Sequence, residues 1–151
     1  MQTQAQDAKV AIIFAWNFGR VVTLLTRDGN MPKSEALKRV EEYKKYMAIN
    51  ATYGVPHPIS KEVDEVWHNH VLDTVDYAEF SRQIFGRFYH HIPIFDQAGQ
   101  VMLRERYKKH TLPHLQALFG KPNKLWTEAR VICIGEGGGG QGPCEGPVIN
   151  L

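Results

Sequence analysis

The chain has 151 residues, of which 43% are hydrophobic, and it carries 18 Lys and Arg against 16 Asp and Glu. This length fits one domain, and the ordinary apolar fraction excludes a wholly disordered chain. A formal net charge of +2 excludes the dense basic surface of a dedicated nucleic-acid binder. Two cysteines are too few for the framework of a disulfide-stapled secreted domain. We therefore expect a soluble cytoplasmic protein that binds neither nucleic acid nor membranes, with a protein partner and the oligomeric state left open.

The most apolar stretch lies near the N-terminus, at residues 10–25. It is shorter than the ~20 residues that cross a bilayer, and it contains Asn17 and Arg20. No Ala-x-Ala cleavage site follows it, which disfavours a secretory signal peptide. Its apolar side chains recur at three- and four-residue steps, so we expect one amphipathic helix over residues 7–26, ended by the segment Asp28-Gly29-Asn30.

A second helix is expected to begin near Pro32, a residue favoured in a first helical turn. The prolines at 56 and 58 end it, because proline lacks the backbone donor and restricts the residue before it. Its charged residues, Glu42 and Lys45 among them, are interpreted as a solvated face. The opposite face is an apolar stripe formed by Ala36, Leu37, Val40, Tyr43 and Met47.

The second half of the chain is expected to hold three more helices and a short terminal element. Ser60 and Asp76 are good N-caps, and Gly86 is a helix stop. Pro113 predicts a kink or a division of its helix in two. The expected elements are helices over residues 61–74, 76–85 and 100–119, an ordered connection over residues 87–96, and a helix or strand over residues 125–134.

These elements predict an all-α fold, a compact bundle of about five or six helices with a short irregular or strand-like C-terminal element. We place this helical domain at residues 1–134. Residues 135–151 are rich in glycine and proline, which predicts a flexible tail.

The histidines are the most unusual feature of the sequence, since four of the seven fall in two tight pairs. Imidazole is a good ligand for zinc, iron, copper and nickel. His68 and His70 are two residues apart on a predicted helix, about 200° of rotation, so they face nearly opposite ways. His70 shares the apolar stripe with Trp67, and the simplest interpretation is a hydrogen-bonded core histidine.

His68 lies one helical turn after Asp64, so the two side chains can meet. They could be two metal ligands, a carboxylate that orients a ligating imidazole, or a pair that only stabilises the helix. A third ligand would come from His90 or His91. The hypothesis is thus a divalent metal ion, zinc among the candidates, bound by Asp64, His68, His90 and His91. His70 and Trp67 would support it, or His70 would replace His68 if the helix presents its other face.

Other candidates are weaker. His110 and His114 have the i, i+4 spacing of a metal-binding pair, but they lie among lysines and are expected at the surface. Cys133 and Cys144 could add thiolate ligands or form a redox pair, although their spacing matches no standard zinc knuckle.

The sequence from Val63 to His70 (VDEVWHNH), followed by Phe85-Gly86-Arg87 and His90-His91, resembles the bacterial glycine-rich domain-containing proteins, which are related to plant proteins of that name. The resemblance covers about residues 33–127. It implies a helical domain with these four histidines, often followed by a glycine- and cysteine-rich tail. It implies no reaction, and the tail here has few cysteines.

We expect an α-helical metal-binding domain of unassigned activity, and whether it is an enzyme is left open. An open coordination position could activate water for hydrolysis. The alternative is a non-enzymatic protein-interaction module whose histidines are structural. An RNA-binding module that uses Arg87, Phe88 and Tyr89 is disfavoured by the near-neutral charge.

Overall fold

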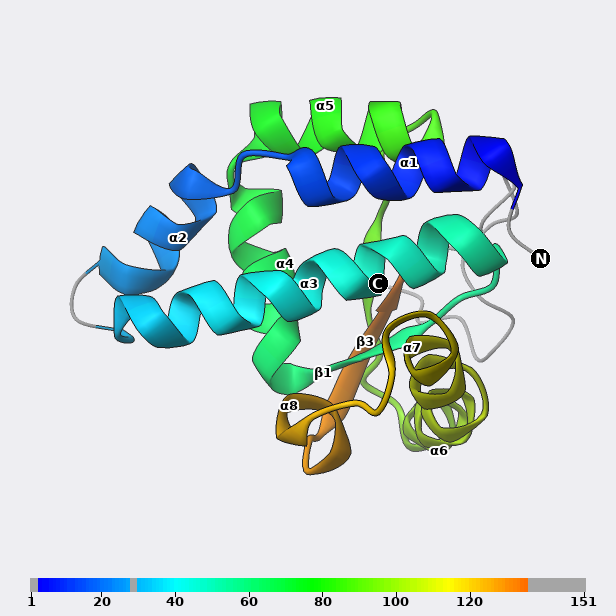
Figure 1. Cartoon of the computed structure of the whole chain (residues 1–151). Helices are drawn as coiled ribbons and strands as arrows, with labels where there is room; N and C mark the ends of the chain where they lie inside the picture. Colours follow the sequence, from blue (N-terminus) through cyan, green and yellow to red (C-terminus); the bar gives the residue numbers. More distant parts are fainter. Residues whose placement is uncertain (1–2, 28–29, 136–151) are drawn as a thin grey trace.

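The structure, a computed structural model, describes residues 3–27 and 30–135 (Figure 1). It is mostly helical with one small sheet, which confirms the predicted all-α class. The elements are α1 (Gln4–Ala15), α2 (Gly19–Thr26), α3 (Lys33–Tyr53), β1 (Pro58–Ser60), α4 (Lys61–Leu72), α5 (Thr74–Phe85), β2 (His91–Pro93), α6 (Gln97–Arg106), the π-helical turn η2 (Tyr107–Thr111), α7 (Leu112–Phe119), α8 (Lys124–Thr127) and β3 (Val131–Gly135). The predicted tail lies almost entirely outside the described residues.

The prediction of one continuous N-terminal helix over residues 7–26 is wrong, because the structure has two helices there, α1 and α2. Trp16 has an extended backbone, with φ −63° and ψ 139°, which ends α1. The Asn17 side chain then accepts a hydrogen bond of 2.9 Å from the Gly19 N–H at the start of α2. In the described part of the chain, no single helix is long and apolar enough to span a membrane. α1 and α2 together meet that length and composition, but they are bent by 50°.

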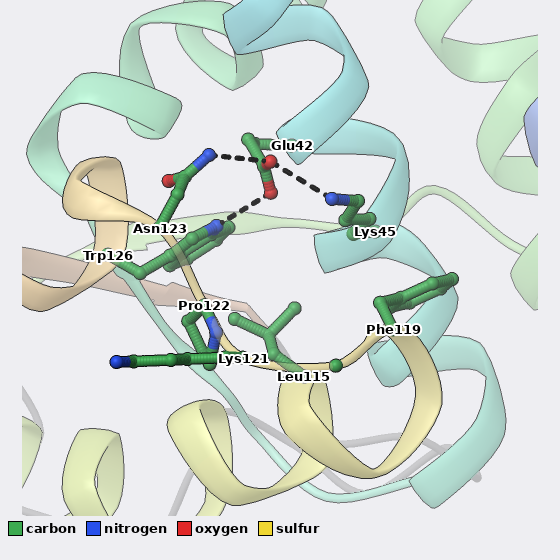
Figure 2. Close-up of a pocket in the computed structure, with 9 residues that line it drawn as sticks. Glu42, Lys45, Leu115, Phe119, Lys121, Pro122, Asn123 and Trp126 are labelled. Carbon is green, nitrogen blue, oxygen red and sulfur yellow. Dashed lines mark hydrogen bonds and ion pairs between the residues drawn. The ribbon is translucent and has the colours of Figure 1, made fainter.

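Helix α3 crosses the middle of the molecule with α1 alongside it (Figure 1). Residues 46–50 are all buried, so this part of α3 is enclosed on every side. Two side chains differ from the expected stripe: Leu37 is 47% exposed, whereas Glu42 is only 6% exposed. Figure 2 shows the reason, since Glu42 accepts hydrogen bonds from Lys45, Asn123 and Trp126 beside a cavity of about 50 Å³.

The capping signals around α4 and α5 are largely as predicted. The Ser60 side chain accepts from the Val63 N–H at the start of α4, and Gly86 ends α5 with φ 76°. The prediction that Asp76 caps the next helix is wrong, because Asp73 occupies that position. Asp76 lies inside the first turn of α5, and its carboxylate turns toward the core.

The small sheet is antiparallel, with strand order β1-β3-β2. Cys133 lies on the middle strand, opposite Ile59 of β1 on one side and Pro93 of β2 on the other. Both outer strands contain a proline, Pro58 or Pro93, which an edge strand tolerates because one side of its backbone needs no ladder donor. The C-terminal element predicted as a helix or a strand begins with the short helix α8 and continues as strand β3.

The predicted helix with Pro113 is divided into α6, η2 and α7. The widened turn ends two residues before the proline, and the Leu112 N–H donates five residues back to the Tyr107 carbonyl. A proline ring clashes with the carbonyl four residues earlier in a regular helix. A π-helical turn relocates the carbonyls at this point, so the chain continues without a sharp stop.

Candidate metal centre

Three potential metal ligands from separate elements meet beside the sheet: Asp64, His91 and Cys133. One donor atom of each lies within 4.8 Å of the other two. Asp64 is in the first turn of α4, which follows directly from the edge strand β1. His91 is on β2 and Cys133 on β3, so the antiparallel pairing brings their strands together.

The contact between Asp64 and His91 is short, with 2.6 Å between Oδ1 and Nε2. When the carboxylate is ionised, the imidazole N–H on Nε2 donates this hydrogen bond. The Trp67 ring packs edge-on against the His91 ring, with 4.4 Å between centroids and 69° between planes. This ring contact limits the orientations that the imidazole can adopt.

Cys133 is 3% exposed. Burial raises the pKa of its thiol well above the usual range, and the nearby Asp64 carboxylate raises it further by charge and by accepting a hydrogen bond. A thiol in such surroundings stays protonated near neutral pH and is a poor nucleophile. The arrangement therefore does not suit a thiol hydrolase, whereas a bound cation would favour the thiolate.

The structure brings together two of the four predicted ligands, Asp64 and His91, and leaves out the other two. His68 is exposed on α4, and the described contacts of Asp64 are with His91 and Cys133. His90 is also exposed, and its ring lies 5.0 Å from the ring of Phe88. Successive side chains of an extended chain point to opposite sides, so only one member of the His90-His91 pair can face inward.

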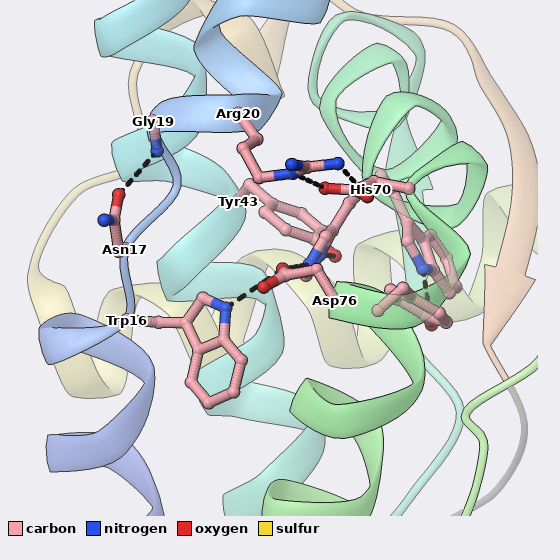
Figure 3. A network of polar contacts seen from close by, with 10 residues as sticks. Trp16, Asn17, Gly19, Arg20, Tyr43, His70 and Asp76 are labelled. Atoms are coloured by element: carbon pink, nitrogen blue, oxygen red, sulfur yellow. Dashed lines mark hydrogen bonds and ion pairs between the residues drawn. The ribbon is translucent and has the colours of Figure 1, made fainter.

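His70 is a core histidine with both ring nitrogens in hydrogen bonds, the simplest interpretation of its place in the sequence. Its Nδ1 lies 2.8 Å from the Tyr43 hydroxyl oxygen, and its Nε2 lies 2.8 Å from Oδ2 of Asp76 (Figure 3). The Trp16 indole N–H donates to the same Asp76 oxygen. Burial lowers the pKa of His70, while Asp76 opposes that shift. Both ring nitrogens of His70 are thus hydrogen-bonded to residues outside the Asp64, His91 and Cys133 group.

Trp67, the other predicted supporting residue, is completely buried. Its indole N–H donates to the Tyr77 hydroxyl over 2.9 Å, and that hydroxyl donates to the Tyr89 carbonyl. These bonds fix the indole that packs on His91.

The structure also contains a second histidine cluster, formed by His57, His110 and His114, which the sequence pattern does not predict. His57 is fully buried, with Nδ1 3.1 Å from Oδ1 of Asn50 and Nε2 2.7 Å from Nδ1 of His114. His114 is half-buried rather than at the surface as expected, because its ring stacks on Tyr53 with centroids 3.6 Å apart. Burial, and then the charges of His114 and His110, lower the pKa of His57 well below its usual range. The helical spacing of His110 and His114 does not predict the contact with His57, because His57 meets His114 only in the tertiary fold.

From the sequence, Cys133 is predicted only as a possible thiolate ligand or as one member of a redox pair. The β-branched residues Val131 and Ile132 before it are compatible with a strand, one of the two predicted alternatives, but no local pattern places that strand beside α4. Cys144, the other cysteine that could supply a thiolate ligand or form a redox pair with Cys133, lies outside the described residues.

Comparison with known proteins identifies a family. A family model described as UCP032817-like matches residues 8–115. The chain belongs to the UCP032817-like family. The match contains Asp64 and His91 and ends before Cys133, so the third donor lies outside the part that defines the UCP032817-like match. No curated protein and no solved structure matched the chain. The resemblance to glycine-rich domain-containing proteins stays a prediction.

Proposed function

We propose that this protein binds one divalent metal ion, zinc in first place, through Asp64, His91 and Cys133. The observation that carries the proposal is the convergence of a carboxylate, an imidazole and a thiol from α4, β2 and β3. These three donor types are the ligands that zinc takes in proteins, whereas magnesium and calcium prefer oxygen donors alone.

The geometry is close to that of a zinc site. Tetrahedral bonds of about 2.0 Å to nitrogen and oxygen and about 2.3 Å to sulfur place the ligand atoms about 3.3–3.5 Å apart. The described donors, within 4.8 Å of one another, would contract slightly around the ion. The Asp64 to His91 distance would instead widen from 2.6 Å, as the ion replaces the hydrogen bond between them.

The site favours a structural role over hydrolysis. Asp64 is 8% exposed and Cys133 3%, and the His91 side chain is 17% exposed, so among the described residues the three donors have little contact with solvent. An ion here would tie the start of α4 to strands β2 and β3. Three protein ligands leave a fourth position of a tetrahedral ion for one further donor. The cytoplasmic location, the protein partner and the absence of nucleic acid among the partners stay predictions.

The test is zinc binding by the metal-stripped full chain, measured by competition with a chromophoric chelator. Wild type should bind one zinc and release about one proton near pH 7, because the protonated Cys133 must become a thiolate. His91→Ala and Cys133→Ser should weaken binding by at least the roughly 10- to 100-fold that loss of an outer-shell partner costs. His90→Ala and His68→Ala are matched controls, being exposed histidines next to the site, and should bind as wild type does.

A spectroscopic readout separates ligation from indirect effects. Cobalt in place of zinc should give a thiolate-to-metal charge-transfer band in wild type and in His90→Ala, and none in Cys133→Ser. Far-UV circular dichroism of each metal-free variant shows whether it folds. Equal zinc affinity in His90→Ala and His91→Ala would contradict the proposed ligand set.

A second candidate is the protein-interaction module with structural histidines. The observation that favours it is that the buried imidazoles His70 and His57 are each held by hydrogen bonds to both nitrogens. Thermal melting of the wild-type protein with chelator and with added zinc distinguishes the two candidates. A wild-type protein whose melting temperature ignores chelator and added zinc would support the interaction module.

A further inference from the structure

A cavity of about 410 Å³ lies between the α6–η2–α7 segment and the connection from α8 to β3. We call it the η2 pocket. Three cations line it, Arg104 from α6, Lys108 from η2 and Arg130 from the connection, together with apolar surface from Leu112 and Val131. This volume is in the range of small-molecule binding sites, roughly 300–1,000 Å³.

The η2 pocket has an uncompensated positive charge. None of the described residues that line it carries a carboxylate. Among the described residues, none of these three cations forms an ion pair, whereas Arg20, Arg39 and Arg82 each contact an acidic side chain. Arg104 and Lys108 are four residues apart on a continuous helical segment, a like-charge spacing that destabilises a helix unless an anion compensates it.

The backbone at this pocket is also unusual. Tyr107 and Lys108 begin the π-helical turn η2, and such turns frequently occur at functional sites. The Tyr107 hydroxyl donates to the Trp126 carbonyl, and both side chains line the pocket from buried positions. This bond joins the two walls, so the pocket is preformed rather than dependent on a moving loop.

We propose that the η2 pocket binds the phosphate monoester of a small molecule with a compact apolar body. The guanidinium groups of Arg104 and Arg130 offer the planar donors that match an oxyanion, and Lys108 adds a point charge. Leu112 and Val131 supply the apolar surface for the rest of the molecule. This site uses none of the proposed metal ligands.

The test is calorimetric titration of the full chain, kept metal-free with chelator, using phenyl phosphate, inorganic phosphate and phenol as probes. Phenyl phosphate should bind more tightly than inorganic phosphate, and phenol should not bind measurably. The affinity for phenyl phosphate should fall as sodium chloride is raised, because salt screens the exposed cations. These results together assign both the charge and the apolar part of the ligand.

Lys108→Gln and Lys109→Gln form the decisive pair, because both lysines lie on η2, both are exposed, and only Lys108 lines the pocket. Lys108→Gln should weaken phenyl phosphate binding by about tenfold, the effect of one charge-assisted hydrogen bond, and Arg104→Gln and Arg130→Gln should do the same. Lys109→Gln should leave the Kd within about twofold of wild type. Equal weakening by Lys108→Gln and Lys109→Gln, phenyl phosphate binding no tighter than inorganic phosphate, or no binding at millimolar concentration would each overturn the proposal.

Discussion

The Nε2 atom of His91 lies 2.6 Å from Oδ1 of Asp64, and this contact joins strand β2 to the first turn of helix α4. The contact is only partly buried, and it brings a thiol on the neighbouring strand β3 within reach of both side chains. A hydrogen bond of this kind holds the two elements in the metal-free protein. An ion that took its place would hold three elements instead of two.

Zinc should therefore stabilise the folded protein. If the folded chain binds zinc and the unfolded chain does not, the free energy of unfolding rises by about 2.7 kcal/mol at a free zinc concentration of 100 times the Kd. Urea denaturation with and without buffered zinc measures this increase. His90→Ala should show the full increase, and an increase that persisted in His91→Ala would contradict ligation by that residue.

Replacing Glu42 by Gln should destabilise the protein by about 1–3 kcal/mol. Trp126 Nε1 donates to one carboxylate oxygen over 2.9 Å, and Asn123 and Lys45 donate to the other (Figure 2). A Gln amide turns one of these acceptors into a donor that faces another donor. Glu41→Gln is the control, because Glu41 is exposed and pairs only with Lys44 among the described contacts; its cost should stay below about 0.5 kcal/mol. Chemical denaturation of both variants gives the comparison.

Tyr43→Phe should cost about 1–3 kcal/mol, because it leaves Nδ1 of the buried His70 without its partner (Figure 3). Tyr53→Phe is the matched control, since it keeps the ring that stacks on His114. The free energies of unfolding of the two variants measure the difference. Equal costs would show that the bond to His70 contributes nothing beyond the loss of a hydroxyl group.

The protein should lose stability as the pH falls below about 6.5, the ordinary pKa of histidine. The pKa of His57 is lowered in the folded state by burial and by neighbouring histidines, and that of His70 is lowered by burial. Below 6.5 the unfolded chain therefore binds protons that the folded chain does not, so each such histidine removes up to about 1.4 kcal/mol per pH unit.

The free energy of unfolding between pH 7 and pH 5 tests this slope. His57→Gln should reduce the slope even though it also lowers the overall stability. A wild-type stability that is flat over this range would refute the assignment.

Cys133 should react slowly with a thiol reagent in the folded, metal-free protein, because it is buried and its pKa is raised. A Cys144→Ala background isolates this thiol. The reaction with a disulfide reagent at pH 8 should be slow in buffer and fast in concentrated urea. Fast reaction in buffer would mean that the β3 thiol is accessible to solvent.

Local signals in the sequence determined where several of the helices begin or end. Ser60 caps α4 and Gly86 ends α5, because a side-chain acceptor and a left-handed glycine act on their own backbone neighbours. Pro113 determined where the long C-terminal helix is divided. The position of His70 on an apolar stripe was sufficient to predict a hydrogen-bonded core histidine.

The contacts of the polar side chains depend on how the elements pack in the folded chain. Helical spacing relates Asp64 to His68, but the fold turns Asp64 toward the sheet and leaves His68 exposed. The pairing of β2 with β3 brings Cys133 to Asp64 and His91, and the approach of α8 buries Glu42. Periodicity determines which residues share a face of one element. The partner of that face depends on strand register and helix packing between residues far apart in the chain, and no local pattern encodes that choice.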